Sequence, residues 1–193
     1  MKTKINIAIF ASGTGSNAQK IISHFEHNEL IHIALIVSNK ADAGVLNIAN
    51  AAKIPSIVIE RNQFMKGDGY VNTLQKHDIE WIILAGFLWK VPETLISAFP
   101  QKIINIHPAL LPKYGGKGMY GHFVHEAVVA NKEKESGITI HFIDEHYDHG
   151  AHIFQAKCEI QEQDTAEIVA KKVLALEHQY FPTIIEKTIL SKN

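Results

Sequence analysis

Residues 102–118 read KIINIHPALLPKYGGKG. Residues 102–106 have the apolar content of a short buried strand, and Pro108 ends the ladder because proline has no N–H to donate. Asn105 and His107 are two residues apart, so their side chains point to the same side of the strand. Ligands of open α/β sheets bind at the carboxyl ends of strands, which places an amide and an imidazole where a ligand would lie. The alternative is that both side chains only cap neighbouring backbone groups.

The segment after this strand is rich in proline and glycine. Such a composition predicts a loop of special backbone geometry rather than another helix or strand. Because the loop must turn sharply, and because similar proteins share the feature, we expect the bond between Leu111 and Pro112 to be cis.

A second signal lies near the N-terminus, where an apolar strand at residues 4–10 runs into SGTGSN at residues 12–17 and then a helical pattern at residues 18–25. The two glycines permit a tight turn and a close approach of the backbone to a ligand. Ser16 or Asn17 can cap the helix. The free N–H groups at the start of this helix predict an anion site, for which a phosphate is the natural ligand.

This glycine loop has two other interpretations. Gly13, Gly15 and Ala18 match a dinucleotide-binding fingerprint, but the strand at residues 31–37 is followed by Ser38 where a ribose-binding acid is expected. A Walker loop is excluded because no Gly-Lys-Ser/Thr follows the glycines. A turn that merely joins a strand to a helix is the remaining alternative.

The rest of the chain alternates between short apolar runs and helical patterns, which predicts an α/β fold: a mostly parallel twisted sheet with helices on both faces. We expect Asp164 and Glu167 to form a capping pair at the start of the last helix. Further strands are expected at residues 56–59, 79–85, 137–143 and 151–160, and further helices at residues 44–53, 121–130 and up to residue 77.

The length of 193 residues fits one domain or at most two small ones, and the net charge is -1. The charges are dispersed, so nucleic acid is not an expected partner. Cys158 is the single cysteine and cannot form an internal disulfide, which favours a reduced, cytoplasmic setting. The chain shows neither a leader pattern nor an apolar run of membrane length, so no membrane association is expected.

Three stretches together resemble one family: ASGTGSN at 11–17, NIHPALLPKYGGKG at 105–118 and HFIDEHYDHG at 141–150. The chain resembles the glycinamide ribonucleotide formyltransferases of purine biosynthesis from about residue 5 to about residue 182. The resemblance implies a Rossmann-like formyltransferase domain over residues 1–193. About 1–100 would bind the ribonucleotide phosphate, and about 101–193 would carry catalysis and folate binding.

The resemblance also implies a reaction of one-carbon metabolism. A formyl group passes from 10-formyltetrahydrofolate, the co-substrate, to the amino group of 5'-phosphoribosylglycinamide by direct attack of the amine. Asn105 and His107 would stabilise the tetrahedral intermediate, and Asp148 would orient His107 and assist proton movement. Thr139 and His141 would order a water. The implied partners are small molecules, and the protein is expected to be a monomer or a homodimer.

Substrate-binding residues follow from the same resemblance. Glu177 would bind the ribose hydroxyls with its two carboxylate oxygens, whereas its residue type alone suggests an exposed helix position. The implied phosphate ligands are Gly13, Thr14, Gly15, Ser16 and Asn17.

The folate is expected at the end of the strand that closes near residue 85. The large apolar residues there predict either core packing or a pocket for a flat ring system. The resemblance assigns them to folate, although this chain has Leu88 and Trp89 where many members have Met and Arg, and the region of Lys66 aligns poorly. The implied folate contacts are Leu88, Trp89, Lys90, Val91 and Asn105.

The histidines invite a metal interpretation. His146, His149 and His152 are spaced by three, but a loop that runs into a strand would not place them on one face. His122 and His125 lack further ligands at convincing spacing. We therefore expect an ordinary polar loop, an ordinary helix face and no metal.

Two relatives of the superfamily, tRNA formyltransferase and formylfolate hydrolase, would share the Asn, His and Asp core. Each would carry a further domain, so the length of this chain favours neither. A nucleotide-binding regulatory module without chemistry would keep the glycine loop but would not need Asn105, His107 and Asp148 together.

Overall fold

The computed structural model describes residues 4–192. The strands are β1 (Ile5–Phe10), β2 (Ile31–Ser38), β3 (Ser56–Val58), β4 (Ile79–Leu84), β5 (Ile103–His107), β6 (Glu135–Phe142) and β7 (His152–Glu159). The helices are α1 (Ser16–Phe25), α2 (Gly44–Ala51), α3 (Arg61–Lys66), α4 (Val71–Lys76), α5 (Glu93–Ala98), α6 (His122–Ala130) and α7 (Ala166–Lys192).

Among these residues the strands form one sheet in the order β3-β2-β1-β4-β5-β6-β7. β1 pairs in parallel with β2 and β4, and β2 pairs in parallel with β3, whereas β6 and β7 are antiparallel. The predicted mostly parallel α/β sheet is confirmed. The chain divides into two compact units between Ile104 and Asn105, inside β5.

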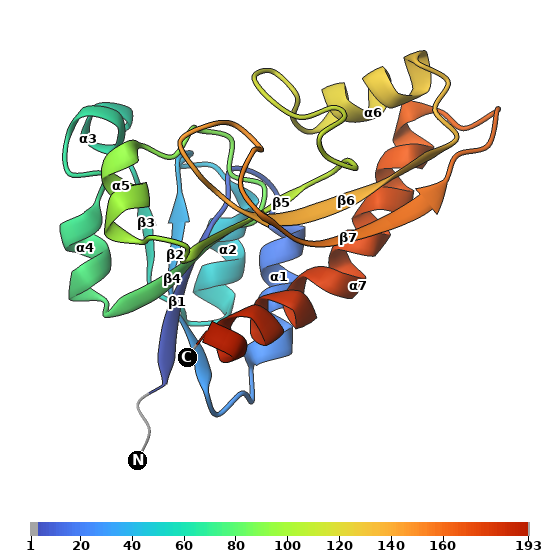
Figure 1. The fold of residues 1–193 in the computed structure, drawn as a ribbon. Helices are drawn as coiled ribbons and strands as arrows, with labels where there is room; N and C mark the ends of the chain where they lie inside the picture. The colour runs from blue at the N-terminus through green and yellow to red at the C-terminus, as the bar shows by residue number, and fades with distance from the viewer. Residues whose placement is uncertain (1–3, 193) are drawn as a thin grey trace. The chain divides into compact units, whose positions relative to one another are not determined.

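The first unit has the strand composition that a parallel sheet requires. Strands covered on both faces need nearly continuous apolar runs, and β1 buries residues 7–10 completely while β4 buries Trp81, Ile82 and Ile83 completely. Figure 1 shows α1 and α2 on one side of these strands and α4 and α5 on the other. The apolar strands therefore form the centre of this unit, and its loops emerge at the strand ends.

The second unit is built on the β6–β7 hairpin, against which α7 packs. The loop between the two strands carries Asp148 and returns to the sheet at Gly150. The backbone of Gly150 lies so close to the carbonyl of Phe142 that no side chain fits there. Glycine at this position therefore fixes how the loop that carries Asp148 rejoins β7.

The expected cis bond between Leu111 and Pro112 is confirmed. β5 extends one residue further than expected, so His107 is its last residue rather than the residue after it. The helix α3 was not expected from the sequence. No side chain caps this helix at Glu60, so the sequence carries no start signal for it. Phe64 within the helix is completely buried, which the sequence does not reveal.

Both capping predictions are wrong. The N-cap of α1 is Gly15, in the left-handed region at φ 82°, and no side chain caps this helix. At the start of α7 the hydroxyl of Thr165 accepts the N–H of Ile168 at 3.4 Å. Asp164 instead accepts hydrogen bonds from the Gln161 N–H and the Lys172 ammonium. The sequence spacing correctly indicated polar side chains near the start of each helix. It could not show that Gly15 would be the N-cap of α1, or that Asp164 would bind Lys172 instead of capping α7.

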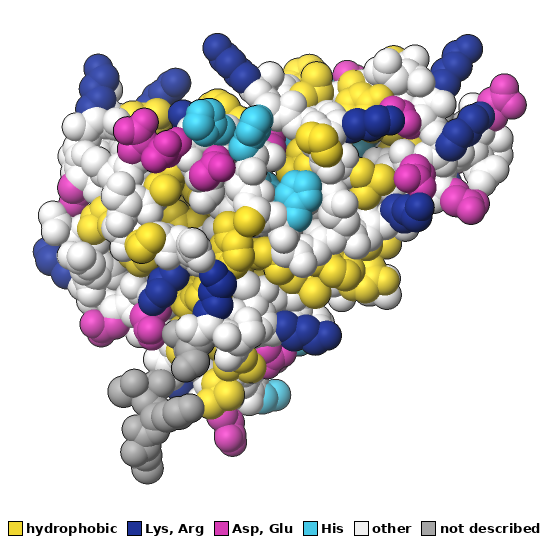
Figure 2. All heavy atoms as spheres, viewed as in Figure 1, with side chains coloured by type: hydrophobic (Ala, Val, Ile, Leu, Met, Phe, Trp, Pro, Cys, Tyr) yellow, Lys and Arg dark blue, Asp and Glu magenta, His cyan; other side chains and the backbone are white. Residues whose placement is uncertain are grey.

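The described surface carries charges of both signs. On the face shown in Figure 2, Lys and Arg side chains are interspersed with Asp and Glu side chains. No helix within residues 4–192 is both long and apolar enough to cross a membrane.

His125 is a buried titratable residue on α6. Burial lowers its pKa, and the positive charges of His107 and His122 act in the same direction. Within residues 4–192 its Nδ1 atom has no hydrogen-bond partner. The folded protein therefore holds this imidazole in its neutral form near pH 7.

The buried His125 predicts a loss of stability in mild acid. The pKa of His125 is lower in the folded state than in the unfolded chain, so the unfolded chain binds more protons. The unfolded chain is therefore stabilised relative to the folded state as the pH falls below about 6.5. The free energy of unfolding, measured with urea, should therefore decrease from pH 7.5 to pH 5.5. The His125→Leu variant should show a shallower decrease. An unchanged slope in this variant would contradict the buried, neutral state of His125.

Candidate active site

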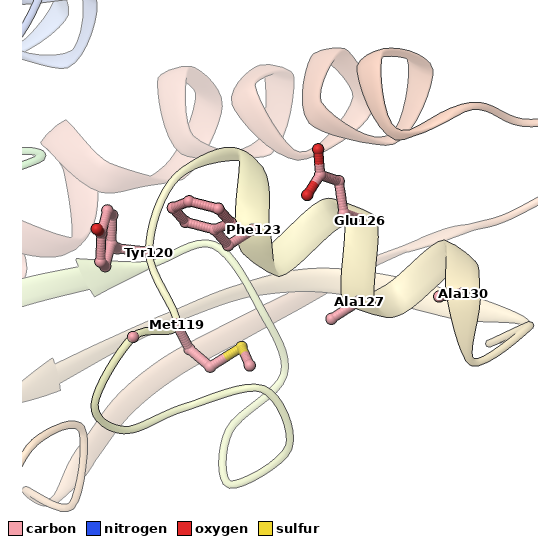
Figure 3. A pocket seen from close by; sticks show the side chains of 7 residues that line it. Met119, Tyr120, Phe123, Glu126, Ala127 and Ala130 are labelled. Atoms are coloured by element: carbon pink, nitrogen blue, oxygen red, sulfur yellow. The ribbon is translucent and has the colours of Figure 1, made fainter.

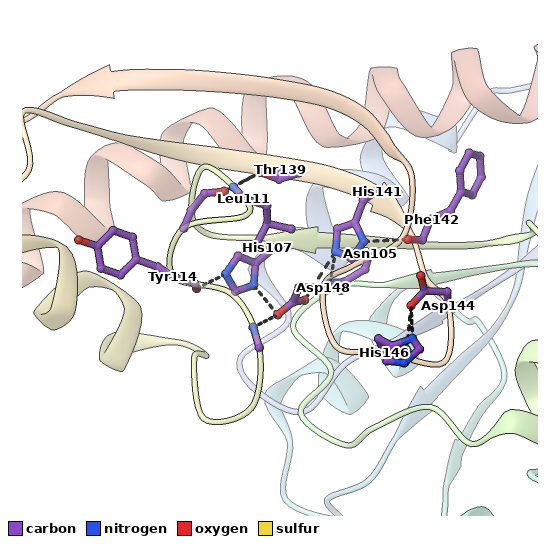
Figure 4. A network of polar contacts seen from close by, with 12 residues as sticks. Asn105, His107, Leu111, Tyr114, Thr139, His141, Phe142, Asp144, His146 and Asp148 are labelled. Carbon is purple, nitrogen blue, oxygen red and sulfur yellow. Dashed lines mark hydrogen bonds and ion pairs between the residues drawn. The ribbon is translucent and has the colours of Figure 1, made fainter.

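Asn105 and His107 project from the same side of β5, and their side chains enter one polar network in the second unit (Figure 4). His107 is buried, whereas Asn105 is partly exposed. Asp148 joins the network from the loop between β6 and β7, and His141 joins it from β6. The three predicted catalytic residues thus lie together, although more than forty residues of sequence separate His107 from Asp148.

The two ring nitrogens of His107 have different neighbours. Nε2 lies 2.7 Å from the carbonyl oxygen of Tyr114, and because a carbonyl can only accept, Nε2 carries a hydrogen and donates it. Nδ1 faces the Oδ2 atom of Asp148 at 3.7 Å. Nδ1 is therefore the ring nitrogen of His107 that faces the carboxylate.

Asp148 is held by backbone as well as by charge. Its Oδ2 atom accepts the N–H of Gly116 at 2.9 Å, and its Oδ1 atom lies 3.7 Å from Nε2 of His141. Its backbone φ is 56°, in the left-handed region that residues other than glycine seldom adopt. Strained residues of this kind are concentrated at functional sites.

His141 is completely buried and determines the orientation of Asn105. Burial lowers the pKa of His141, while the Phe142 carbonyl and Asp148 act in the opposite direction. Nδ1 donates to the Phe142 carbonyl at 2.8 Å, so in the neutral ring Nε2 must accept, and it accepts from Nδ2 of Asn105 at 3.0 Å. The second N–H of the Asn105 amide stays available to a ligand.

Thr139 does not have the expected water-ordering role. Its hydroxyl donates to the Ala109 carbonyl at 2.7 Å and accepts from the Leu111 N–H at 3.0 Å. It also accepts from Nε2 of Gln155 at 2.8 Å, and this amide nitrogen lies 3.0 Å from the Leu111 carbonyl. A hydroxyl has one donor and two acceptor positions, so all are used by protein groups. Thr139 instead clamps the loop that follows His107.

The histidines of the loop after β6 are not arranged as a metal site. His146 and His149 have ring centroids 5.7 Å apart, and Nδ1 of His146 lies 4.0 Å from Asp144. Among residues 4–192, no group of three or more His, Cys, Asp or Glu side chains is placed to hold a metal ion.

The glycine loop lies in the first unit, between β1 and α1. At Gly15 a Cβ atom would lie 2.8 Å from the Cα atom of Val45, and the φ of 82° would strain any other residue there. Gly13 differs, because a Cβ atom there would have no neighbour within 4 Å among the described residues. The two glycines therefore differ: Gly15 is required by packing and by its backbone angle, whereas Gly13 borders open space.

Ser12, which the sequence did not single out, joins the glycine loop to the predicted folate stretch. It is buried, its N–H donates to the Gly86 carbonyl at 3.1 Å, and its hydroxyl accepts the Leu88 N–H at 2.9 Å. Both predicted binding segments of the first unit are therefore connected by a single serine.

The predicted folate residues differ in their exposure. Leu88 is 47% exposed, whereas Val91 is buried in the core. The ring of Trp89 lies against Phe64 at a centroid distance of 5.9 Å, and the Arg61 guanidinium lies 6.0 Å from the Trp89 ring. Val91 thus fits the core interpretation of this stretch, whereas Leu88 is presented to solvent.

Glu177 is buried on α7, unlike an ordinary exposed helix glutamate.

A separate pocket of about 550 Å3 lies between the 118–120 segment and α6 (Figure 3). It is lined mainly by apolar side chains, among them Met119, Tyr120 and Phe123, and it includes none of the predicted site residues.

The chain matches the formyl transferase family over residues 5–185. It is 36% identical over 187 residues to phosphoribosylglycinamide formyltransferase of Bacillus subtilis (strain 168), which covers 94% of this chain and 93% of that protein. Identity with the chloroplastic phosphoribosylglycinamide formyltransferase of Arabidopsis thaliana is 39% over 185 residues, and the chain spans 63% of the length of that protein. A crystal structure of phosphoribosylglycinamide formyltransferase from Bacillus halodurans superposes with a TM-score of 0.87 at 32% identity, covering 97% of each chain.

These matches include the glycine loop, β5 and the loop that carries Asp148, because all three lie within residues 5–185. The resemblance deduced from the sequence motifs is confirmed. The chain belongs to the formyl transferase family and, within it, to the phosphoribosylglycinamide formyltransferases.

Proposed function

We propose that this protein transfers a formyl group from 10-formyltetrahydrofolate to the amino group of 5'-phosphoribosylglycinamide in purine biosynthesis. Family membership supports the reaction class. The observation that carries the proposal is the network of Asn105, His107 and Asp148. Protein partners hold each side chain, and an Asn105 N–H, Nδ1 of His107 and the Asp148 carboxylate are left to act on a substrate.

The amine attacks the formyl carbon directly, and the carbonyl oxygen becomes an oxyanion. Stabilising this charge requires hydrogen-bond donors that are already oriented. Asn105 supplies one from the amide nitrogen that His141 keeps in place. His107 supplies a second from Nδ1 when the imidazole is protonated, since Nε2 is committed to the Tyr114 carbonyl.

One proton must move from the attacking amine to N10 of the folate. The bond from carbon to the amine nitrogen forms, and the bond from carbon to N10 breaks. Asp148 takes the proton from the amine, directly or through water, and the protonated imidazole of His107 gives its Nδ1 proton to N10 as the bond from carbon to N10 breaks. Asp148 then passes its proton to Nδ1 of His107, which restores both groups. His141, which burial keeps neutral, does not carry this proton but holds Asn105.

The ribonucleotide phosphate binds the glycine loop at residues 13–17. The N-terminus of α1 offers N–H groups and the positive end of the helix dipole, which suit a phosphate monoester. The open space beside Gly13 allows close approach to the backbone. Glu177 binds the ribose hydroxyls, for which its two carboxylate oxygens are suitable acceptors.

The folate contacts of this proposal are residues 88–91 and Asn105. The Phe87 ring packs against Phe10 and Phe64 at centroid distances of 5.3 and 5.7 Å, which gives this stretch a rigid apolar support. Leu88 presents an exposed apolar side chain for a ring system. Because Trp89 is already packed against Phe64, its side chain supports the site from one face.

We further propose that residues 1–193 act as one formyltransferase domain, as a monomer or a homodimer in the cytoplasm. Cys158 takes no part in the chemistry, and burial raises the pKa of its thiol, which keeps it in the unreactive protonated form.

The first prediction concerns the proposed catalytic pair. His107→Ala and Asp148→Ala should each lower kcat at least about a hundredfold, because a lost general acid–base or oxyanion group costs on that order. The KM for the ribonucleotide should change less than about twofold. The measurement is the rate of formyl transfer to phosphoribosylglycinamide with 10-formyltetrahydrofolate as donor.

His146→Ala is the matched control, because His146 lies in the same loop as Asp148 and its side chain is 72% exposed. It should retain the wild-type kcat. Release of free formate without an acceptor, or formyl transfer to charged tRNA in place of the ribonucleotide, would contradict the proposed substrate. Near-normal turnover in both alanine variants would contradict the catalytic assignment.

The second prediction concerns the phosphate loop. Gly13→Ala should raise the KM for the ribonucleotide at least about tenfold, since a single hydrogen bond to a charged group is worth that much, while the folate KM stays unchanged. The added methyl group fits the protein itself but occupies space intended for the phosphate. Thermal unfolding should show a melting temperature close to that of the wild type.

Gly15→Ala provides the comparison, because its Cβ atom meets Val45 and should lower the melting temperature whether or not a ligand binds. Inorganic phosphate should compete with the ribonucleotide, and NAD should not bind. An unaltered ribonucleotide KM in Gly13→Ala, or micromolar affinity for NAD in calorimetry, would overturn this assignment.

A further inference from the structure

A short turn, residues 114–116, contacts both members of the proposed catalytic pair. Its Tyr114 carbonyl accepts the hydrogen bond from Nε2 of His107 at 2.7 Å, and its Gly116 N–H donates to Oδ2 of Asp148 at 2.9 Å. One acceptor and one donor only two residues apart therefore fix the imidazole and the carboxylate. Any shift of this turn changes both contacts at once.

The turn has a conformation that needs support from outside. Tyr114 has a φ of 57° and Gly116 a φ of 92°, both in the left-handed region. For a tyrosine this region is unfavourable, so neighbouring contacts must hold the backbone there. Gly115 between them is also tightly placed, because a Cβ atom would lie 2.5 Å from Leu111 and 3.3 Å from Cβ of Asp148.

The support comes from the side chain of Tyr114 itself. Its hydroxyl donates to Oε1 of Glu133 at 3.0 Å, just beyond the end of α6, and the Lys113 ammonium donates to the same oxygen at 2.9 Å. The hydrogen bond from Lys113, and next the one from Tyr114, lower the pKa of the Glu133 carboxyl. Burial and the neighbouring Glu133 carboxylate raise the pKa of the Tyr114 hydroxyl. At neutral pH a phenol therefore donates to a carboxylate, which is a charge-assisted hydrogen bond.

We propose that Tyr114 and Glu133 are positioning residues for formyl transfer. Their hydroxyl–carboxylate bond holds the 114–116 turn so that the Tyr114 carbonyl keeps the hydrogen of His107 on Nε2 and leaves Nδ1 directed at Asp148. Neither residue touches the reacting atoms. The inference rests on the proposed catalytic role of His107 and Asp148.

Lys113 has a different role from Tyr114, although both bind Glu133. The Lys113 side chain is 68% exposed, and exposed ion pairs contribute little because water screens them and the long side chains lose freedom. Tyr114 instead acts through a rigid ring attached directly to the backbone carbonyl that contacts His107. Removal of the Lys113 ammonium should therefore leave the turn in place.

The test compares Tyr114→Phe with Lys113→Met. Tyr114→Phe removes one oxygen atom and keeps the ring and the backbone carbonyl, so any effect comes from the lost bond to Glu133. We expect kcat to fall about five- to thirtyfold with the KM of both substrates within about twofold, since ground-state binding is untouched. Lys113→Met should keep kcat within about twofold of the wild type.

A second readout observes His107 directly. Nitrogen-15 NMR at alkaline pH, where imidazoles are neutral, distinguishes a protonated from an unprotonated ring nitrogen, and His107→Ala identifies the signals. In the wild type the hydrogen should be on Nε2. In Tyr114→Phe both nitrogen signals should move toward the average of the two tautomers, whereas a general loss of stability would leave them in place.

Glu133→Gln should reproduce the effect in part, because an amide oxygen is a weaker acceptor than a carboxylate. The double variant Tyr114→Phe/Glu133→Gln should be no slower than Tyr114→Phe alone, since both changes remove the same bond. Wild-type kcat and wild-type ring signals in Tyr114→Phe would overturn the inference. If His107→Ala itself keeps normal turnover, it is the proposed function that fails, and the ring signals still report whether the turn sets the tautomer.

Discussion

A backbone carbonyl can only accept a hydrogen bond, and this one-sided chemistry determines the protonation of both imidazoles in the site. The Tyr114 carbonyl requires a hydrogen on Nε2 of His107, and the Phe142 carbonyl requires one on Nδ1 of His141. The two histidines therefore adopt opposite tautomers. His107 presents Nδ1 to Asp148, and His141 presents Nε2 to the amide of Asn105.

Burial adds to this arrangement. His141 is completely buried and its pKa is lowered, so it remains a neutral acceptor that orients Asn105. His107 lies beside a carboxylate that a backbone N–H holds in place. Two histidines on neighbouring strands thus have different surroundings: His141 is a fixed support for Asn105, and His107 faces the Asp148 carboxylate, where we propose that it exchanges a proton. The φ of 56° at Asp148 is unfavourable for the backbone, so the contacts around this residue must hold it there.

Much of the fold follows from the sequence because the strands of a parallel sheet must be apolar throughout. Residues 79–84 are apolar except for Glu80, and the alternation along β5 places Asn105 and His107 on one side. The motifs were also specific enough to indicate the family, which the comparisons confirm. The errors concern short local signals. Gly15 rather than Ser16 or Asn17 is the N-cap of α1, and α3 has a completely buried Phe64 but no side-chain cap at its start.

The sequence by itself determined the sheet, the position of the glycine loop and the residue types available for chemistry, because periodicity and special residues such as proline act over a few positions. Tertiary structure alone decided which partners those residues have. Thr139 saturates its hydroxyl on the loop after His107, and Tyr114 reaches Glu133 across nineteen residues of sequence. A hydrogen bond depends on distances of about 3 Å between atoms, and such distances between remote residues are set only when the whole unit has packed.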